Sequence, residues 1–363
     1  MGKLDVGGQA VIEGVMMRGP KSMVIAVRKP DDTIVVKDSE WVPLVQRHKW
    51  LKAPFIRGGV VMLEALVNGM QALTFSANVA MEEEQKAEAA AKAEADGVTP
   101  LPTASGTSAA TDVMTKGAIA ISLATSLALG AGLFIYTPHV VASAIYGLLG
   151  GVPLAELLTY EAPVESPVFH TLVGMLKMTI FVCYILLIRR MADIRRVFQY
   201  HGAEHKSIHA YEAGEELTVA NAKKWPTYHP RCGTSFLVFV IIISIGFFAG
   251  VFPILQTYLF PPDLTGWKLN LLQASVKLPM MFPIAGIAYE LIKWAGKQQA
   301  GKGVMRVLGI PGQMMQKLTT IEPDDGQLEV ALVSLRRALE HEGALEIPDW
   351  GGVEFLTAEA AAS

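Results

Sequence analysis

The sequence predicts a mainly α-helical protein that crosses a membrane about four times, with a small β-rich N-terminal unit and a helical tail. Three observations predict this class. Apolar residues make up 51% of the 363 residues and charged residues only 18%, whereas soluble domains are about one-quarter charged. Several apolar runs reach the ~20 residues that a helix needs to cross the hydrocarbon core. Basic residues gather in alternate connections between these runs.

Four runs are long and apolar enough to be transmembrane helices. They cover residues 117–136, 169–188, 235–259 and 271–294. The fourth run contains Lys277, Pro279, Pro283 and Glu290. We therefore expect it to be kinked and packed against protein rather than lipid. The run 140–149 is too short to cross, so we expect it to lie at the membrane interface.

The distribution of Lys and Arg predicts the side of the membrane that each connection occupies. Residues 189–233, between the second and third runs, are rich in both, whereas residues 137–167 contain neither. The segment after the fourth run is basic again. Because positive charge marks cytoplasmic connections, we expect both termini to lie in the cytoplasm.

Smaller parts surround the apolar runs. Residues 23–27 and 33–36 flank a polar turn, which predicts a β-hairpin. Apolar residues recur every three or four positions in 327–340, which predicts a helix that packs on the β-rich unit. The predicted parts are a cytoplasmic β-rich unit at 1–53, an amphipathic helix at 54–80, a flexible linker at 81–112, two spans within 113–188, a cytoplasmic His- and Cys-containing loop at 189–234, two spans within 235–294 and a cytoplasmic helical tail at 295–363.

Metal-binding side chains cluster in the loop between the second and third spans. His201, His205 and His209 follow one another at four-residue steps, so on a helix they share one face. Glu204 completes His-x-x-Glu-His, the inverted zincin spacing, in which two His bind zinc and the Glu handles the proton of a water. Glu212 follows on the same stretch as a further candidate ligand.

Two more candidate metal ligands follow about twenty residues after His209. His229 and Cys232 are three residues apart, a spacing at which both can reach one ion. Zinc accepts imidazole, thiolate and carboxylate ligands, so it is the expected cofactor, with another divalent metal as the alternative. If both of these residues join His201 and His205, the ion is fully coordinated and structural. If only three residues bind, a water remains and Glu204 can act as its base.

A single His is more often a surface or hydrogen-bonded residue than a ligand. Clustering favours a site, because four of the eight His and one of the two Cys lie between positions 201 and 232. Glu13 and Arg18 lie in a glycine-rich opening segment and allow two interpretations. Glu13 completes the metal site or binds substrate, with Arg18 as its ion-pair partner or an anion clamp. Alternatively, the segment is a tight β structure whose glycines serve turns, which we favour for Glu13.

Several stretches of the chain resemble those of a known protein family. The sequences His-Gly-Ala-Glu-His-Lys at 201–206 and His-Pro-Arg-Cys-Gly-Thr-Ser-Phe at 229–236, with the segments 7–18 and 318–331, resemble the bacterial YqhQ-like family. The resemblance covers nearly the whole chain except the Ala-rich stretch near 81–110. The family is catalogued as a domain of unknown function and is often labelled a predicted metal-dependent enzyme. That label is itself a prediction from the His and Cys residues, so it adds no independent support for catalysis.

The resulting hypothesis is a zinc-dependent hydrolase of the bacterial cytoplasmic membrane, with Glu204 as general base at the cytoplasmic face. The candidate ligands lie close to two span ends, so a lipid or a membrane peptide is the expected substrate. Two alternatives stay open: a non-enzymatic scaffold or transporter with a structural metal, and a metal-homeostasis protein. No block of Lys and Arg suggests a nucleic-acid partner, and no oligomeric state is predicted.

Overall fold

The computed structural model describes residues 4–95, 121, 124–157, 166–230, 232–261, 266–297, 304–346 and 350–356. The chain forms two compact units. The first combines Met1–Lys86, Ile185–Val240 and Val276–Ser363, and the second combines Ala87–Tyr184 and Ile241–Ser275. Helices dominate the described residues, as the sequence predicts.

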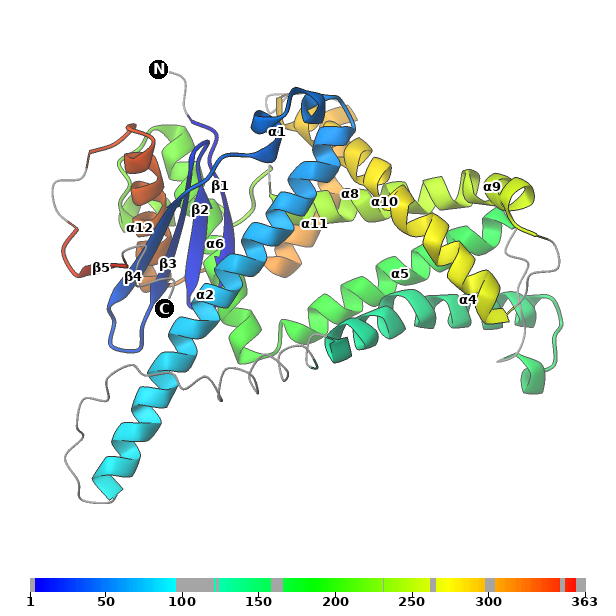
Figure 1. The fold of residues 1–363 in the computed structure, drawn as a ribbon, viewed down its shortest axis with the longest axis horizontal. Coiled ribbons are helices and arrows are strands. Elements are labelled where there is room, and N and C mark those ends of the chain that lie inside the picture. The colour runs from blue at the N-terminus through cyan, green and yellow to red at the C-terminus, as the bar shows by residue number, and fades with distance from the viewer. Residues whose placement is uncertain are drawn as a thin grey trace. The chain divides into compact units, whose positions relative to one another are not determined.

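A five-stranded sheet lies within the first unit (Figure 1). Its strands are β1 (Gly7–Val11), β2 (Gly14–Arg18), β3 (Ser22–Arg28), β4 (Ile34–Glu40) and β5 (Val353–Leu356). Strands β1 to β4 pair antiparallel in chain order, and β5 pairs parallel with β4. The predicted β-rich unit is confirmed, and the predicted hairpin is β3–β4. The predicted helical tail also supplies β5, because the open edge of β4 offers backbone groups for pairing.

Helices make up most of the rest of the described chain. The longer ones are α2 (Ile56–Ala95), α4 (Thr137–Leu149), α5 (Pro167–Ile188), α6 (Ala192–Ala213), α8 (Gly233–Gly250), α10 (Gly266–Lys297), α11 (Val304–Thr319) and α12 (Asp325–His341). The shorter ones are α1 (Leu44–Arg47), η1 (Lys49–Lys52), η2 (Gly132–Tyr136), η3 (Leu154–Glu156), α7 (Val219–Lys223) and α9 (Phe252–Leu259).

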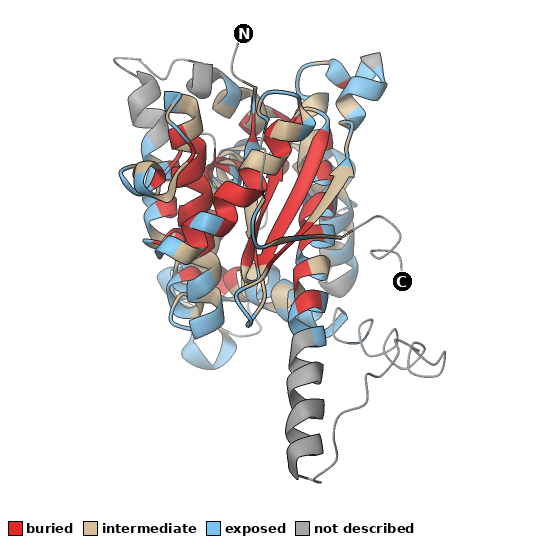
Figure 2. Cartoon of the chain, turned by 90° about the vertical axis from the view of Figure 1, so that its left-hand side faces the viewer, coloured by how far each residue is buried: buried red, intermediate tan, exposed pale blue. Residues whose placement is uncertain are grey.

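Both faces of the sheet are buried. In β2, Val15 and Met17 point to one face and Met16 to the other, as the two-residue period of a strand requires. Helices α6 and α12 pack on the first face, and α2 packs on the second through Ala72 and Val79. Figure 2 shows buried residues concentrated on the strands and on the helix sides that face them. The sheet therefore holds α6 in a fixed place between β1 and α12.

A capping box begins α12. Asp324 accepts a hydrogen bond from the amide of Gln327 at 2.8 Å, and the Gln327 side chain accepts one from the amide of Asp324 at 3.0 Å. Further along, Arg337 donates to Asp38 of β4 at 2.6 Å. The helix thus packs on the β-rich unit, as predicted for residues 327–340.

Within the described residues, five helices are long and apolar enough to cross a membrane, by length and composition. They are Ile56–Glu82, Ala124–Leu149, Pro167–Ile188, Gly233–Gly250 and Leu271–Lys293. The last four correspond to the predicted spans. The first lies in α2, where the sequence predicts an amphipathic helix.

Two of the predicted spans have different boundaries. The first apolar helix continues through η2 into α4, so residues 140–149 are its continuation and not a separate segment. Residues 117–120, 122 and 123 of the predicted span lie outside the described residues. The predicted span 235–259 is divided into α8 and α9, with Pro253 in the first turn of α9, where its missing N–H costs least.

Helices extend into the predicted linker and into the predicted His- and Cys-containing loop. The predicted linker 81–112 begins as the end of α2, which reaches Ala95, and residues 96–112 lie outside the described part of the chain. The predicted loop 189–234 contains α6 and α7. Most of the candidate ligands therefore sit on a regular helix rather than on a loop.

An aromatic cluster holds the second unit together. Phe169 of α5 is fully buried, and its ring lies edge-on to those of His139 and Tyr146 at 5.1 and 6.2 Å. His170 packs against Phe252 of α9 at 5.3 Å. Helices α4, α5 and α9 are joined through these rings.

Candidate metal centre

Helix α6 presents three histidines along one face. His201, His205 and His209 follow at four-residue steps, about one turn each. The helix also approaches the chain after α11 closely, because Gly202 has no side chain. A Cβ at Gly202 would lie 2.2 Å from the carbonyl oxygen of Ile321. Gly202 therefore allows the close approach of α6 to this segment.

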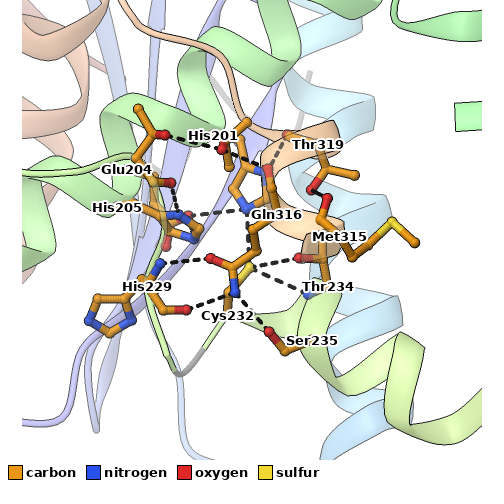
Figure 3. Close-up of polar contacts among 12 residues, drawn as sticks. His201, Glu204, His205, His229, Cys232, Thr234, Ser235, Met315, Gln316 and Thr319 are labelled. Atoms are coloured by element: carbon orange, nitrogen blue, oxygen red, sulfur yellow. Dashed lines mark hydrogen bonds and ion pairs between the residues drawn. The ribbon is translucent and has the colours of Figure 1, made fainter. Parts of the chain in front are cut away.

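His201, His205 and Cys232 form the first group, which we call the inner group (Figure 3). Their ligand atoms all lie within 4.8 Å of one another. Nε2 of His201 is 3.3 Å from Sγ of Cys232, and the two imidazole rings are 4.5 Å apart. His205 and Cys232 are buried and His201 is half-buried, so the group is shielded from bulk water.

Backbone carbonyls orient both imidazoles of the inner group. His201 Nδ1 is 2.9 Å from the carbonyl oxygen of Thr319, and His205 Nδ1 is 2.6 Å from that of Thr227. A carbonyl only accepts, so each Nδ1 carries the proton and each Nε2 keeps a lone pair. Nε2 of His205 is buried and has no hydrogen-bond partner among the described residues. Metal-ligating histidines are typically held in this way by a hydrogen bond from the opposite ring nitrogen.

The sulfur of Cys232 lies immediately before the first turn of α8. It accepts a hydrogen bond from the amide of Thr234 at 3.4 Å and lies 3.1 Å from the Thr234 hydroxyl. A helix N-terminus and nearby donors stabilise a thiolate. Burial nevertheless raises the pKa of Cys232, so a bound cation is needed to keep this sulfur ionised.

Glu204 lies beside the inner group. Its Oε2 is 3.6 Å from Nε2 of His205 and 3.9 Å from Nε2 of His201. Burial raises the pKa of Glu204 to about 8 despite the opposing effects of His201 and of a hydrogen bond from the Gly8 backbone. A Cβ at Gly8 would lie 2.6 Å from Cγ of Glu204. A glycine in β1 therefore makes room for this carboxyl group.

His229 lies in a different group from Cys232, although only three positions separate them. Its Nε2 is 3.2 Å from Oε2 of Glu212, and its ring is 4.6 Å from that of His209. The ligand atoms of His209, Glu212 and His229 lie within 4.8 Å of one another, and we call these three residues the outer group. Burial lowers the pKa of His229 to about 4, so its imidazole is neutral at neutral pH.

Gln316 of α11 holds the turn that carries His229 (Figure 3). Its side chain accepts a hydrogen bond from the amide of His229 at 2.7 Å and donates to the carbonyl of the same residue at 2.9 Å. It also donates to the Ser235 hydroxyl at 2.7 Å. Gln316 is fully buried, so all three contacts are shielded from water.

Sequence reasoning missed four residues that build the centre. Gly8 carries a detectable signal, since a glycine inside a strand often marks a close approach. Gln316 gives no such signal, because a lone Gln has no distinctive spacing. Thr227 and Thr319 act through backbone carbonyls, which every residue type supplies. Only the folded chain identifies these contacts.

Glu13 and Arg18 belong to neither group of ligand atoms in the described part of the chain. The Glu13 carboxylate pairs with Arg196 of α6 and accepts a hydrogen bond from the hydroxyl of Tyr200 at 3.3 Å. The Arg18 guanidinium lies 4.5 Å above the ring of Trp41. The interpretation of Arg18 as the partner of Glu13 is therefore corrected. Glu13 has a positive φ of 50° at the β1–β2 turn, in keeping with a tight β structure.

Comparisons with known proteins extend over most of the chain. A family model described as "Protein of unknown function (DUF1385)" matches residues 53–341. The uncharacterized protein YqhQ of Bacillus subtilis (strain 168) is 31% identical over 347 residues, which cover 94% of each chain. No solved structure gives a significant match. The family resemblance seen in the sequence is confirmed, and the matched range contains both groups of ligand atoms.

Proposed function

The chain belongs to the DUF1385 family of unknown function, and we propose that it is a zinc-dependent hydrolase of the bacterial cytoplasmic membrane. The convergence of three donor atoms in the inner group is the observation that carries this proposal. The donor atoms are the unprotonated Nε2 atoms of His201 and His205 and the buried sulfur of Cys232. Both nitrogens are oriented by backbone carbonyls before any ion binds.

The donor set of the inner group fits zinc. Two imidazoles and one thiolate are common zinc ligands, and three protein ligands leave a fourth position open, as in catalytic zinc sites. When bound, zinc would supply Lewis-acid activation of water and of the scissile group. The orphaned Nε2 of His205 supports the fit, because a buried polar atom without a partner costs free energy that a ligand would recover.

Glu204 is the proposed proton acceptor. Its carboxyl group faces the Nε2 atoms of both histidines, so it would lie within reach of water activated by an ion that these histidines would hold. With a pKa near 8 it is mostly protonated at neutral pH without a cation, and a neighbouring cation favours its ionised form. In that form it takes the proton of the attacking water and returns it to the leaving group. The Gly8 backbone holds the carboxyl in place for both transfers.

The first unit also supports four membrane crossings. Strands β1–β4 share one core with α6 and α12, so these elements lie on one side of the membrane. In the described part of the chain, three apolar helices separate β4 from α6, namely those in α2, 124–149 and α5. The apolar helices α8 and α10 separate α6 from α12. Three crossings would put α6 on the opposite side from the strands that it contacts. Helix α2 therefore packs on the sheet without crossing, and the other four apolar helices cross.

The proposed orientation places both termini and the metal centre in the cytoplasm. The segments that contain α6 and the end of the chain carry the basic residues, as cytoplasmic connections do. A reducing compartment keeps Cys232 available as a ligand. The centre lies close in sequence to two proposed spans, since α5 ends at Ile188 and α8 begins at Gly233. A lipid or a membrane peptide is therefore the proposed substrate class.

A specific observation favours a second candidate, a membrane scaffold or transporter with a structural zinc. Ligand atoms around one zinc ion are about 3.3 Å apart, given bond lengths near 2 Å. The Glu204 Oε2 distances of 3.6 and 3.9 Å approach that value. If Glu204 is the fourth ligand, the ion is fully coordinated and has no open position for substrate.

Metal analysis of Glu204→Gln separates the two candidates. The full-length protein is purified in detergent, and its zinc is measured together with hydrolysis of membrane lipids and membrane peptides in vesicles. The hydrolase proposal expects Glu204→Gln to retain zinc at the inner group and to lose hydrolysis. Loss of this zinc in Glu204→Gln supports the structural candidate. Unchanged hydrolysis in that variant contradicts the role of Glu204, and an inner group without metal in the wild-type protein overturns both candidates.

A further inference from the structure

The outer group lies one turn further along α6 than the inner group, and we infer that it binds a second divalent cation. Its residues are His209, Glu212 and His229. This inference goes beyond the proposed function, which requires only the ion of the inner group. The two ions would have separate ligands, because no residue belongs to both groups.

The donor atoms of the outer group are spaced like the ligands of one ion. Oε2 of Glu212 and Nε2 of His229 are 3.2 Å apart, close to the separation of about 3.3 Å expected for two ligands of one zinc ion. The His209 and His229 rings approach to 4.6 Å. All three ligand atoms lie within 4.8 Å of one another. Bond lengths near 2 Å to each donor therefore require only small side-chain adjustments.

Contacts outside the group hold the two histidines in place. Nε2 of His209 is 2.9 Å from the carbonyl oxygen of Tyr228, so this nitrogen is the donor and Nδ1 keeps its lone pair. The His209 ring is stacked on Trp225 at 5.5 Å and 12°. His229 is only 3% exposed, and the Gln316 side chain hydrogen-bonds to both the backbone N–H and the backbone carbonyl of His229. The arrangement resembles that of the inner group, where carbonyls also orient the imidazoles.

The chemistry of the outer group differs from that of the inner group. Two imidazoles and a carboxylate accept zinc but also harder divalent cations, because no thiolate is present. His209 and Glu212 are half-buried, whereas two of the three inner residues are buried. The outer ion is therefore the more exchangeable of the two and should leave first when a chelator is added.

The short segment between His229 and Cys232 links the two ions. His229 would bind the outer ion and Cys232 the inner one, so an ion on the outer group fixes the segment that presents the sulfur. Loss of the outer ion should weaken zinc binding at the inner group without removing any of its ligands. The outer ion is thus assigned a supporting role for the catalytic ion.

Cobalt titration of the metal-free, full-length protein in detergent tests the inference. Co²⁺ bound to a thiolate gives an intense ligand-to-metal absorption, whereas Co²⁺ held by His and Glu does not. The wild-type protein should bind two equivalents, one with this absorption and one without. His209→Ala and the isosteric Glu212→Gln should each lose the second equivalent and keep the first, which they should bind more weakly than the wild-type protein does. Cys232→Ser should lose the thiolate absorption and keep the second, and the control His341→Ala should bind both.

The titration separates failure of this inference from failure of the proposed function. The wild-type protein could bind only the one Co²⁺ that shows thiolate absorption, and Glu212→Gln could bind it equally. That result overturns the outer site and leaves the inner site supported. The wild-type protein could instead bind only one Co²⁺ without thiolate absorption, and Glu212→Gln could lose this ion. That result supports the outer site and overturns the proposed catalytic centre. Glu212→Gln preserves side-chain size. If the metal-free variant unfolds at the same temperature as the metal-free wild-type protein, its loss of metal reflects lost ligation and not misfolding.

Discussion

The backbone of Gly8 lies against the carboxyl group of Glu204, so closely that a Cβ at position 8 would come within 2.6 Å of Glu204 Cγ. The Gly8 backbone also hydrogen-bonds with this carboxyl group. Residues at the two positions are almost two hundred apart in the chain, and the contact joins β1 to α6. A strand of the β-rich unit therefore forms part of the candidate metal centre.

Gly8→Ala should displace the Glu204 carboxyl group from the inner group. The added methyl group overlaps Glu204, so its side chain must rotate away and lose the backbone hydrogen bond. We expect hydrolysis to fall by about 10²-fold, as for loss of a positioned general base, while zinc is retained. Gly7→Ala is the matched control, because a Cβ there meets no described atom within 4 Å. Equal activity of the two variants would contradict the role of Gly8.

Gln316→Leu should destabilise the turn that carries His229. The change removes the hydrogen bonds of Gln316 to the amide and carbonyl of His229 and to the hydroxyl of Ser235. The His229 carbonyl keeps the amide of Cys232 as a partner at 3.2 Å. Unpaired buried polar groups cost about 1–3 kcal/mol each, so we expect a total loss of about 2–4 kcal/mol after partial relaxation. Denaturant unfolding in detergent measures the change. Gln313→Leu on the same helix is the control, since Gln313 is exposed, and a similar loss there would refute the specific role of Gln316.

Asp38 should make stability depend on acid pH. Burial alone would raise its pKa, but hydrogen bonds from His341 and Arg337 outweigh burial and lower the pKa below the usual 3.8. A lowered pKa means that the contribution to stability is present above pH 3.8 and is lost as pH falls through the folded-state pKa.

Asp38→Asn should therefore cost about 1.5–3 kcal/mol at neutral pH, the range for hydrogen bonds to a charged group. Its unfolding free energy should approach that of the wild-type protein as pH falls below the folded-state pKa. Asp325→Asn is the control, because Asp325 pairs with Lys223 at the exposed surface, where ion pairs contribute about 0–1 kcal/mol. A constant difference between Asp38→Asn and wild type across this pH range would contradict the assignment.

Both ends of the apolar part of α2 should lie on the same side of the membrane. Trp50 precedes this helix and is 67% exposed, and Met81 lies near the end of its apolar part and is 52% exposed. In a Cys183→Ser background, Trp50→Cys and Met81→Cys should react with a membrane-impermeant thiol reagent from the cytoplasmic side only. Reaction from opposite sides would show that α2 crosses and would exclude the proposed four-span topology.

Helix α2 has a partly polar side and an apolar side. Its overall apolar content is high enough for criteria of length and composition to select it as a span. Glu64 and Asn68 are 7% and 6% exposed, whereas Leu66 is 64% exposed. The buried side of the first half of the helix is thus partly polar, and the amide of Leu44 donates to Glu64 at 2.5 Å. Its exposed apolar side suits the membrane interface. The sequence period predicts the stripe, but only packing on the sheet decides which side is covered.

The sequence by itself determined the properties that depend on nearby residues. Apolar run length located the long apolar helices, a polar turn between two segments located the β3–β4 hairpin, and four-residue spacing placed His201 and His205 on one face of a helix. Such properties follow from the fixed rise and period of helices and strands.

Tertiary structure decided which distant groups meet. His229 and Cys232 are neighbours in sequence, yet the turn held by Gln316 directs them to different groups. Gly8, β5 and the carbonyl of Thr319 reach their partners through contacts between segments far apart in the chain. The physical reason is that side-chain spacing limits what a segment can present, whereas burial and backbone hydrogen bonding across the whole fold select its neighbours.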